Sequence, residues 1–238
     1  MSFLNVSNIT SCYEEKKAVD NVSFAIDEGD YLCIIGENGS GKSTLMKIIL
    51  GLIKADIGKI EFSNNKRPQI GYLPQQTNVA KDFPANVGEV VLSGCINKRR
   101  HLLFYNKAER MLAMENMQKL NILDLKNKSY NELSFGQQRR ALIARALCAA
   151  DKLIVLDEPM NGLDAITTKE LYELIENLNR GGMTVIMISH DLDNVLSYAN
   201  KVLYMDSKLV FFGEKEGYLK TSYKLTNSKY CVEVNNAI

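Results

Sequence analysis

An octapeptide at residues 36–43, G-E-N-G-S-G-K-S, leaves few folds open to this chain. It follows an apolar run at residues 31–35, and apolar residues recur with helical spacing from residue 42 to about 50. Glycines let the backbone curl until its N–H groups point at one anion, and the start of the following helix adds partial positive charge. The pattern therefore predicts a phosphate-binding loop between a buried strand and a helix.

Side-chain chemistry assigns roles within this loop. Lys42 is predicted to reach the outer phosphates of a nucleotide, and the Ser43 hydroxyl is predicted to ligate Mg²⁺. The loop backbone supplies the other donors. The expected nucleotide-binding residues here are Gly36, Asn38, Gly39, Ser40, Gly41, Lys42, Ser43 and Thr44.

Two adjacent carboxylates, Asp157 and Glu158, follow an apolar run at residues 153–156. Parallel sheets bind their ligands at the carboxyl ends of their strands. Asp157 suits Mg²⁺, and Glu158, on the opposite side of the strand end, is placed to take a proton from an attacking water. A solvated strand exit would give the same pattern in isolation. The phosphate loop upstream favours the functional interpretation.

The order of the remaining elements predicts the fold class. Apolar runs at residues 153–156 and 185–189 enclose residues 171–178, whose apolar side chains follow i, i+3, i+4, i+7 spacing. Strand, helix and strand in this order favour a parallel sheet with right-handed crossovers. Two further short strands are expected at residues 59–62 and 70–73.

One domain is expected over residues 1–238, with two parts. Residues 1–77 and 150–238 are predicted to form an α/β nucleotide-binding core, which begins with short strands joined by turns. Residues 78–149 have helical signals and are predicted to form an inserted helical subdomain.

Composition excludes several classes of protein. The 238 residues carry 29 Lys and Arg against 28 Asp and Glu, so the net charge of +1 gives no field that would favour nucleic acid as a partner. The sequence offers neither a signal peptide nor a run long enough to span a membrane. The five scattered cysteines are typical of free thiols in a reducing cytosol.

A third segment, L-S-F-G-Q at residues 133–137, precedes a strongly helical run. Ser134 is a natural N-cap, and the helix start is a second potential anion site. A capped helix without further function has the same pattern. Two such helix starts and one phosphate loop suggest a nucleotide shared between two copies of the chain.

Together these segments resemble the ABC ATPases, whose motifs occur here in family order over most of the chain. The resemblance implies an α/β P-loop NTPase fold of the RecA-like type, with a parallel sheet, antiparallel strands at the N-terminus and an inserted helical subdomain. The segments that match nucleotide-binding motifs are Tyr13 as the adenine-stacking aromatic, residues 36–43 as the Walker A motif and Gln75 as the Q-loop. Residues 153–158 match the Walker B motif, with Glu158 as the catalytic base, and His190 matches the switch histidine. Residues 133–137 match the family signature, and residues 161–164 match the D-loop with Asp164.

The resemblance also implies cofactors and partners. It implies a head-to-tail homodimer that sandwiches ATP and Mg²⁺, bound to integral membrane permease subunits at the cytoplasmic face of the membrane. Mg²⁺ would be held by Ser43, Gln75 and Asp157, and His190 would contact the γ-phosphate. The signature residues Ser134, Phe135, Gly136 and Gln137 would contact ATP in trans.

Two positions depart from the family pattern: Phe135 stands where glycine is usual, and Asn161 stands where serine is common. A narrower resemblance over residues 70–94 is to the ATPase subunits of zinc and manganese importers. It implies an extracytoplasmic metal-binding protein as a further partner. The permease is expected to dock around residues 75–103.

Several alternatives remain open. An importer of iron chelates, an exporter and a non-transport ABC ATPase all use the same cassette. A nucleotide-binding module without hydrolysis would not need Glu158 or His190. A GTPase is disfavoured because no Asn-Lys pair is followed by x-Asp, the motif that recognises guanine.

Overall fold

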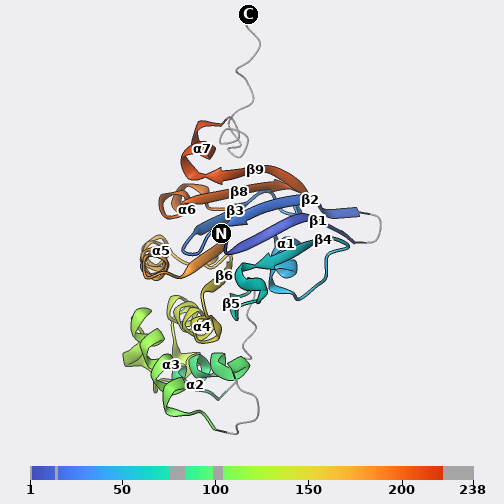
Figure 1. Ribbon diagram of the computed structural model, residues 1–238. Coiled ribbons are helices and arrows are strands. Elements are labelled where there is room, and N and C mark those ends of the chain that lie inside the picture. The colour runs from blue at the N-terminus through green and yellow to red at the C-terminus, as the bar shows by residue number, and fades with distance from the viewer. Residues whose placement is uncertain (1, 14–15, 76–83, 99–103, 222–238) are drawn as a thin grey trace, which may run out of the picture.

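A large, mostly parallel β-sheet forms the centre of the molecule (Figure 1). In spatial order its described strands are β5 (Ile70–Leu73), β6 (Leu153–Asp157), β7 (Thr184–Ile188), β3 (Tyr31–Ile35), β8 (Lys201–Asp206) and β9 (Lys208–Glu214), with β9 antiparallel to β8. All residues of β3, β6 and β7 are buried, as expected for apolar strands that are covered on both faces. The computed structural model describes residues 2–13, 16–75, 84–98 and 104–221.

The two faces of this sheet are buried in two separate cores. Successive side chains of a strand alternate between faces, so Cys33 belongs to one core and Ile34 to the other. A second sheet and α1 cover the face of Ile34, while α5, α6, α7 and the helical part cover the face of Cys33. The flanking helices are α1 (Lys42–Leu50), α5 (Ala165–Arg180), α6 (Leu192–Tyr198) and α7 (Lys215–Lys220).

The second sheet is antiparallel, in the order β2-β1-β4. The expectation of short strands at the N-terminus is wrong, because β1 and β2 are 10 and 11 residues long. Asn8 and Asn21 have positive φ angles of 52° and 53°, and the register shifts near them. These irregularities break the polar–apolar alternation that marks a long strand. The strands are β1 (Leu4–Tyr13), β2 (Lys16–Ile26) and β4 (Ile57–Phe62).

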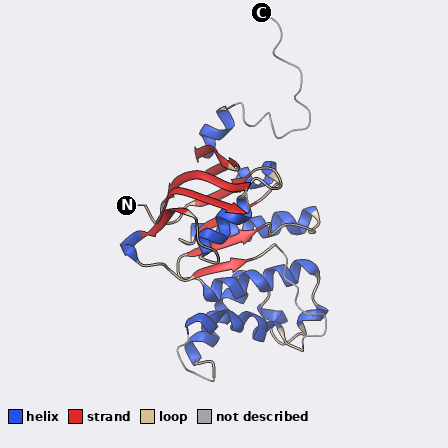
Figure 2. Cartoon of the chain, turned by 90° about the vertical axis from the view of Figure 1, so that its right-hand side faces the viewer, coloured by secondary structure: helices blue, strands red, loops and turns tan. Residues whose placement is uncertain are grey.

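Three helices form a layer beside the sheets (Figure 2). They are α2 (Val87–Leu92), α3 (Lys107–Lys119) and α4 (Phe135–Ala149). Each starts with a capping box, in which the N-cap side chain and the third helical residue bond each other's backbone N–H. Within the described residues, no helix has the length and apolarity needed to cross a membrane. Short 3₁₀ helices lie at Ser63–Asn65, Ser93–Lys98, Leu123–Leu125 and Tyr130–Glu132.

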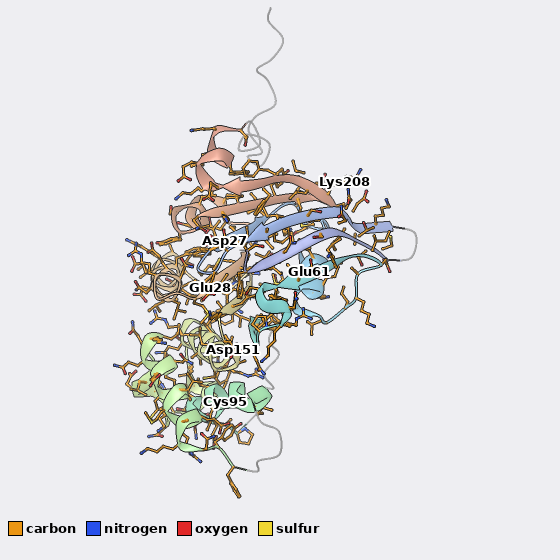
Figure 3. The ribbon with its side chains drawn as sticks, viewed as in Figure 1. Asp27, Glu28, Glu61, Cys95, Asp151 and Lys208 are labelled. Carbon is orange, nitrogen blue, oxygen red and sulfur yellow. The ribbon has the colours of Figure 1, made fainter. Side chains whose placement is uncertain are left out.

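The β8–β9 hairpin completes the large sheet on the side of β3. Its tight turn has Ser207 at a φ of 58°. Lys208, labelled in Figure 3, lies with its Nζ 3.5 Å from Asp20 Oδ2, so the turn is tied to β2. The polar tail that was expected after residue 221 lies outside the described residues.

Candidate functional site

Four neighbouring strands bring the candidate site residues to one edge of the large sheet. In sheet order, β5 leads to Gln75, β6 to Asp157 and Glu158, β7 to His190, and β3 to the phosphate loop. These strands are parallel, so their carboxyl ends all lie on this edge. Segments more than 100 residues apart in the sequence therefore meet where such sheets place their ligands.

The loop between β3 and α1 has the shape that its glycines allow. Gly36 and Gly41 have φ angles of 148° and 92°, which L-residues rarely adopt. A Cβ at Gly36 would overlap the carbonyl oxygen of Met205, and one at Gly41 would overlap that of Ala18. The backbone of β8 and β2 thus encloses the loop from outside, and only glycine fits at both positions.

The side chains of this loop are arranged to receive an anion. Ser40 is 2% exposed and its Oγ has no hydrogen-bond partner in the described part of the chain. Lys42 Nζ donates to the carbonyl oxygens of Gly36 (2.8 Å) and Glu37 (2.7 Å). A buried hydroxyl without a partner and a lysine folded over its own loop both gain bonds when phosphate oxygens arrive. The cradle therefore fits a nucleotide phosphate chain. The other loop residues, Asn38, Gly39 and Ser43, are exposed, and Thr44 is half-buried.

The charge of Lys42 is poorly solvated. Burial lowers its pKa, while the carboxylates of Glu158, Asp157 and Glu37 oppose that shift. The N-terminus of α1 carries no acidic residue in its first turn. An incoming phosphate would therefore meet both a lysine and an uncompensated helix N-terminus.

Asp157 fits the requirements of a magnesium ligand. It is 6% exposed, and burial, reinforced by the charge of Glu158, raises its pKa to about 6. Such a carboxylate is stabilised by a cation. The described residues contain no cluster of three or more His, Cys, Asp and Glu that could hold a metal by themselves. Mg²⁺ is typically bound through one or two carboxylates together with phosphate and water oxygens, so the buried carboxylate of Asp157 fits it.

Glu158 is the residue on which the other catalytic candidates converge. Its side chain is 11% exposed. Its Oε2 accepts a hydrogen bond from Gln75 Nε2 at 2.7 Å, and His190 Nδ1 lies 3.4 Å from Oε1. Its φ of 48° is unusual for a non-glycine residue, and its backbone N–H donates to Ile188 O of β7 at 3.0 Å. Backbone strain held by neighbouring structure is typical of functional positions.

This arrangement can perform acid–base chemistry beside the cradle. Glu158 is a carboxylate aimed at a set of donors, next to a loop that fits phosphates. The His190 side chain is 65% exposed and is therefore free to meet a ligand. The structure brings Gln75, Asp157, Glu158, His190 and the loop together.

The signature residues lie elsewhere in the same chain. Ser134 caps α4, with its Oγ accepting from Gln137 N at 3.3 Å while Gln137 Oε1 accepts from Ser134 N at 3.1 Å. Gly136 packs against α5, since a Cβ there would lie 2.6 Å from Thr167 Cγ2. Phe135 is 52% exposed. Ser134 and Phe135 are thus presented to solvent, while Gly136 packs on α5.

Two further site residues predicted from the sequence, Asp164 and Tyr13, lie at the ends of secondary-structure elements. Asp164 caps α5, accepting from Thr167 N (3.0 Å) and Thr167 Oγ1 (2.7 Å), and these bonds lower its pKa. Tyr13 is the last residue of β1 and pairs with Lys16. The side chain of Tyr13 lies outside what is described.

Sequence reasoning missed two contributors. Asn161, noticed only as a departure from the family, places its Nδ2 3.5 Å from Glu158 Oε2. The β8–β9 turn closes the cradle, because Ser207 N donates to Ser40 O at 2.9 Å. The signal for Asn161 was its spacing of three residues from Glu158. The signal for the β8–β9 hairpin was a pair of apolar runs on either side of Asp206 and Ser207.

The fold and this edge define a P-loop nucleotide-hydrolysing domain. Comparison with known proteins narrows the class, because residues 19–161 match the family described as ABC transporter. The zinc uptake system ATP-binding protein ZurA of Listeria innocua is 35% identical over 223 residues, covering 90% of this chain and 87% of that protein. The manganese transport system ATP-binding protein MntB of Bacillus subtilis is 35% identical over 217 residues, with coverages of 90% and 87%.

Solved structures of ABC transporter cassettes are also similar to this chain over most of its length. The ADP conformation of an ATP-binding cassette of an ABC transporter matches with a TM-score of 0.83 and 30% identity, covering 95% of this chain and 98% of that one. A dimeric cassette in a post-hydrolysis state with ADP and phosphate matches with a TM-score of 0.75 and 30% identity, with coverages of 89% and 98%. The chain belongs to the ABC transporter family, and it is an ATP-binding, ATP-hydrolysing transporter subunit. The predicted fold class, family and ATPase activity are confirmed.

Proposed function

We propose that this chain hydrolyses ATP to drive import of a divalent metal ion, zinc or manganese. The support for the cargo is the resemblance to relatives named for zinc uptake and manganese transport. The observation that carries the catalytic part is the convergence of Gln75 and His190 on Glu158 beside the cradle. An importer of iron chelates and an exporter are the alternatives.

The residues of the cradle have stated roles in this proposal. The loop backbone, Ser40 and Lys42 bind the phosphates of ATP, and Tyr13 stacks on the base. Ser43, Asp157 and Gln75 hold Mg²⁺, which neutralises phosphate charge when bound. The nucleotide-binding core comprises residues 1–77 and 150–238, and the helical subdomain comprises residues 78–149.

Hydrolysis depends on Glu158. Its carboxylate accepts a proton from the attacking water, while Gln75 orients that water and His190 contacts the γ-phosphate. Gln75 bonds Glu158 and His190 lies beside it, so both side chains are directed at the same carboxylate. General-base catalysis of this kind contributes typically about 10²–10⁴ in rate.

A second copy of the chain is needed to complete the site. Ser134 and Phe135 are exposed at the N-terminus of α4, where the helix dipole favours an anion, while Gly136 of the same segment packs against α5. A head-to-tail homodimer places that surface, with Gly136 and Gln137, over the partner's ATP. Asp164 then lies at the same interface.

The permease docks beside Gln75 in this proposal, which puts the dimer at the cytoplasmic face of the membrane. A cavity of about 400 Å³ lies there, lined in part by Tyr72, Pro74, Ile96 and Leu142. Val87 is fully buried and belongs to the helical core instead. Residues 76–83 and 99–103 of the segment expected to dock the permease lie outside the described residues. Crosslinks from cysteine at position 96 to co-purified permease test the placement, and crosslinks only from residues 169–179 would reject it.

Glu158→Gln tests the catalytic proposal. The amide keeps the size and the hydrogen bonding of the side chain but cannot take a proton, so hydrolysis should fall about 10²–10⁴-fold while ATP binding persists. ATP-bound variant should accumulate as dimers, which sizing chromatography with and without Mg-ATP detects. Hydrolysis near the native rate would show that Glu158 is not the base. Loss of hydrolysis in a protein that stays monomeric would contradict the shared site.

Elemental analysis of cells tests the cargo. Cells that lack the gene, grown under limitation for zinc or manganese, should contain less of one of these metals. The native gene should restore that content, and the Glu158→Gln variant should not. A deficit in iron alone would support the chelate importer. Normal metal content with a new sensitivity to excess metal would support an exporter.

A further inference from the structure

Phe135 makes a contact that its place in the signature does not explain. The ring is half exposed, yet one edge packs on the loop that follows β6: a Cβ built at Gly162 would lie 3.2 Å from Phe135 Cε1 and 3.7 Å from Cζ. Gly162 has a φ of 81° and cannot accept a side chain without strain. The ring therefore rests against bare backbone in the loop of residues 158–164.

Arg139 packs on the face of the Phe135 ring. One helical turn after Phe135, its guanidinium carbon lies 5.5 Å from the ring centroid, within the range of a cation–π contact. Arg139 is 5% exposed, and its Nε has no hydrogen-bond partner among the described residues. Burying a guanidinium with an unpaired donor costs free energy. The contact with the face of the Phe135 ring therefore helps to stabilise the buried Arg139 side chain. The two side chains are thus in contact on the first turns of α4.

The loop that the ring touches leads to the catalytic carboxylate. Asn161 Nδ2 lies 3.5 Å from Glu158 Oε2, and Asn161 N donates to Glu158 O at 3.2 Å. Leu163 also approaches α4, since its Cδ2 would lie 3.9 Å from a Cβ at Gly136. The loop between Glu158 and α5 is thus in contact with α4 on one side and with the carboxylate on the other.

We propose that Phe135, steadied by Arg139, is a positioning residue that braces this loop in its own chain and so keeps Asn161 on the carboxylate of Glu158. The inference rests on the proposed role of Glu158 in hydrolysis, and it adds to the role of Phe135 across the dimer. The side-chain contact of Asn161 is at the long end of hydrogen bonding. A small displacement of the loop would therefore break it, whereas the 2.7 Å bond from Gln75 would remain.

A variant series tests the brace. Phe135→Ala should lower kcat about threefold to tenfold, toward the lower end of the coupling between residues in contact, with the KM for ATP changed less than about twofold. Phe135→Leu, which still covers Gly162, should restore most of the rate. Phe135→Ala combined with Asn161→Ala should be no slower than Asn161→Ala alone, because both act through one contact. Met111→Ala removes an exposed apolar side chain of α3 and is the matched control.

Hydrogen exchange of the nucleotide-free protein gives a readout that does not depend on hydrolysis. Amides of residues 160–164, which follow Pro159, should exchange faster in Phe135→Ala and be unchanged in Met111→Ala. Unchanged exchange, or rate losses that multiply in the double variant, would overturn the brace. If Glu158→Gln keeps native hydrolysis while the exchange result stands, the catalytic proposal has failed and the brace itself has not.

Mixed dimers separate the action in one chain from the action across the interface. A partner with Lys42→Ala leaves one working site, built from the other chain's cradle and Glu158. The rate should fall when Phe135→Ala is in the chain that supplies Glu158. An equal or greater loss when it is only in the Lys42→Ala chain would show that Phe135 acts across the interface, against the proposal.

Discussion

Replacing Asp157 by asparagine should make the nucleotide-free protein more stable while abolishing its activity. The carboxyl group is 6% exposed at the end of β6, and its pKa is raised from 3.8 to about 6. Burial is the main cause, and the adjacent charge of Glu158 adds to it. The residue is thus suited to a bound cation and is unfavourable to the fold without one.

The sign and size of the effect follow from the pKa. Between pH about 4 and 6 the folded chain holds a proton on Asp157 that the unfolded chain has lost, so the free energy of unfolding decreases as pH rises through this window. Above pH 6 the full penalty remains, about 3 kcal/mol for a shift of about two units. Asparagine removes it but leaves Lys42 without one of its counter-charges. We therefore expect a net gain of about 1–2 kcal/mol at pH 8.

Thermal and urea unfolding without Mg²⁺ or nucleotide measure this gain. About 1–2 kcal/mol corresponds to a rise in Tm of about 2–8 °C for a chain of this size. The advantage should shrink below pH 6 and vanish below about pH 4, where the native carboxyl becomes protonated in both states. Asp206→Asn, at an exposed carboxyl, is the control and should change little. A variant less stable than the native protein at pH 8, or a gain independent of pH, would refute the reasoning.

Three further outcomes are expected. Gly41→Ala should lower the free energy of unfolding in urea clearly more than Gly39→Ala. The new Cβ at position 41 overlaps Ala18 O, whereas the one at position 39 meets nothing within 4 Å. At position 39 only the left-handed backbone strain of about 1–2 kcal/mol applies. Ser134→Ala should lose about 1 kcal/mol of unfolding free energy with the N-cap bond. If stacking on Tyr13 is the main contact with the base, kcat/KM for ATP and GTP should differ by less than about a thousandfold.

The parts of the fold that the sequence predicts are those with local or continuous signals. Residues 42–50 were expected as a helix and form α1 with those bounds. The strands expected at residues 70–73, 153–156 and 185–189 form β5, β6 and β7, within one residue at each end. Buried parallel strands are apolar on both faces, so they stand out as unbroken runs.

The parts that the sequence does not predict depend on contacts between distant segments. The positive φ of Glu158 has no sequence signal, since nothing in a glutamate marks it for that region. The approach of Met205 O to Gly36 requires β8 to pair with β3, a pairing that periodicity cannot specify. The contact of Phe135 with Gly162 is likewise invisible, because α4 and the loop after β6 pack together only in the tertiary structure.

The distribution of donors around Glu158 indicates which oxygen is available for chemistry. Oε2 already accepts from Gln75 and is near Asn161, so its two lone pairs both have donors. Oε1 lies 3.4 Å from His190 Nδ1, and the His190 side chain is mostly exposed. The donors from β5 and from the loop after β6 thus anchor one oxygen, while the donor after β7 stands beside the other. If Glu158 is the general base that we propose, this arrangement predicts that the attacking water gives its proton to Oε1, beside the exposed His190.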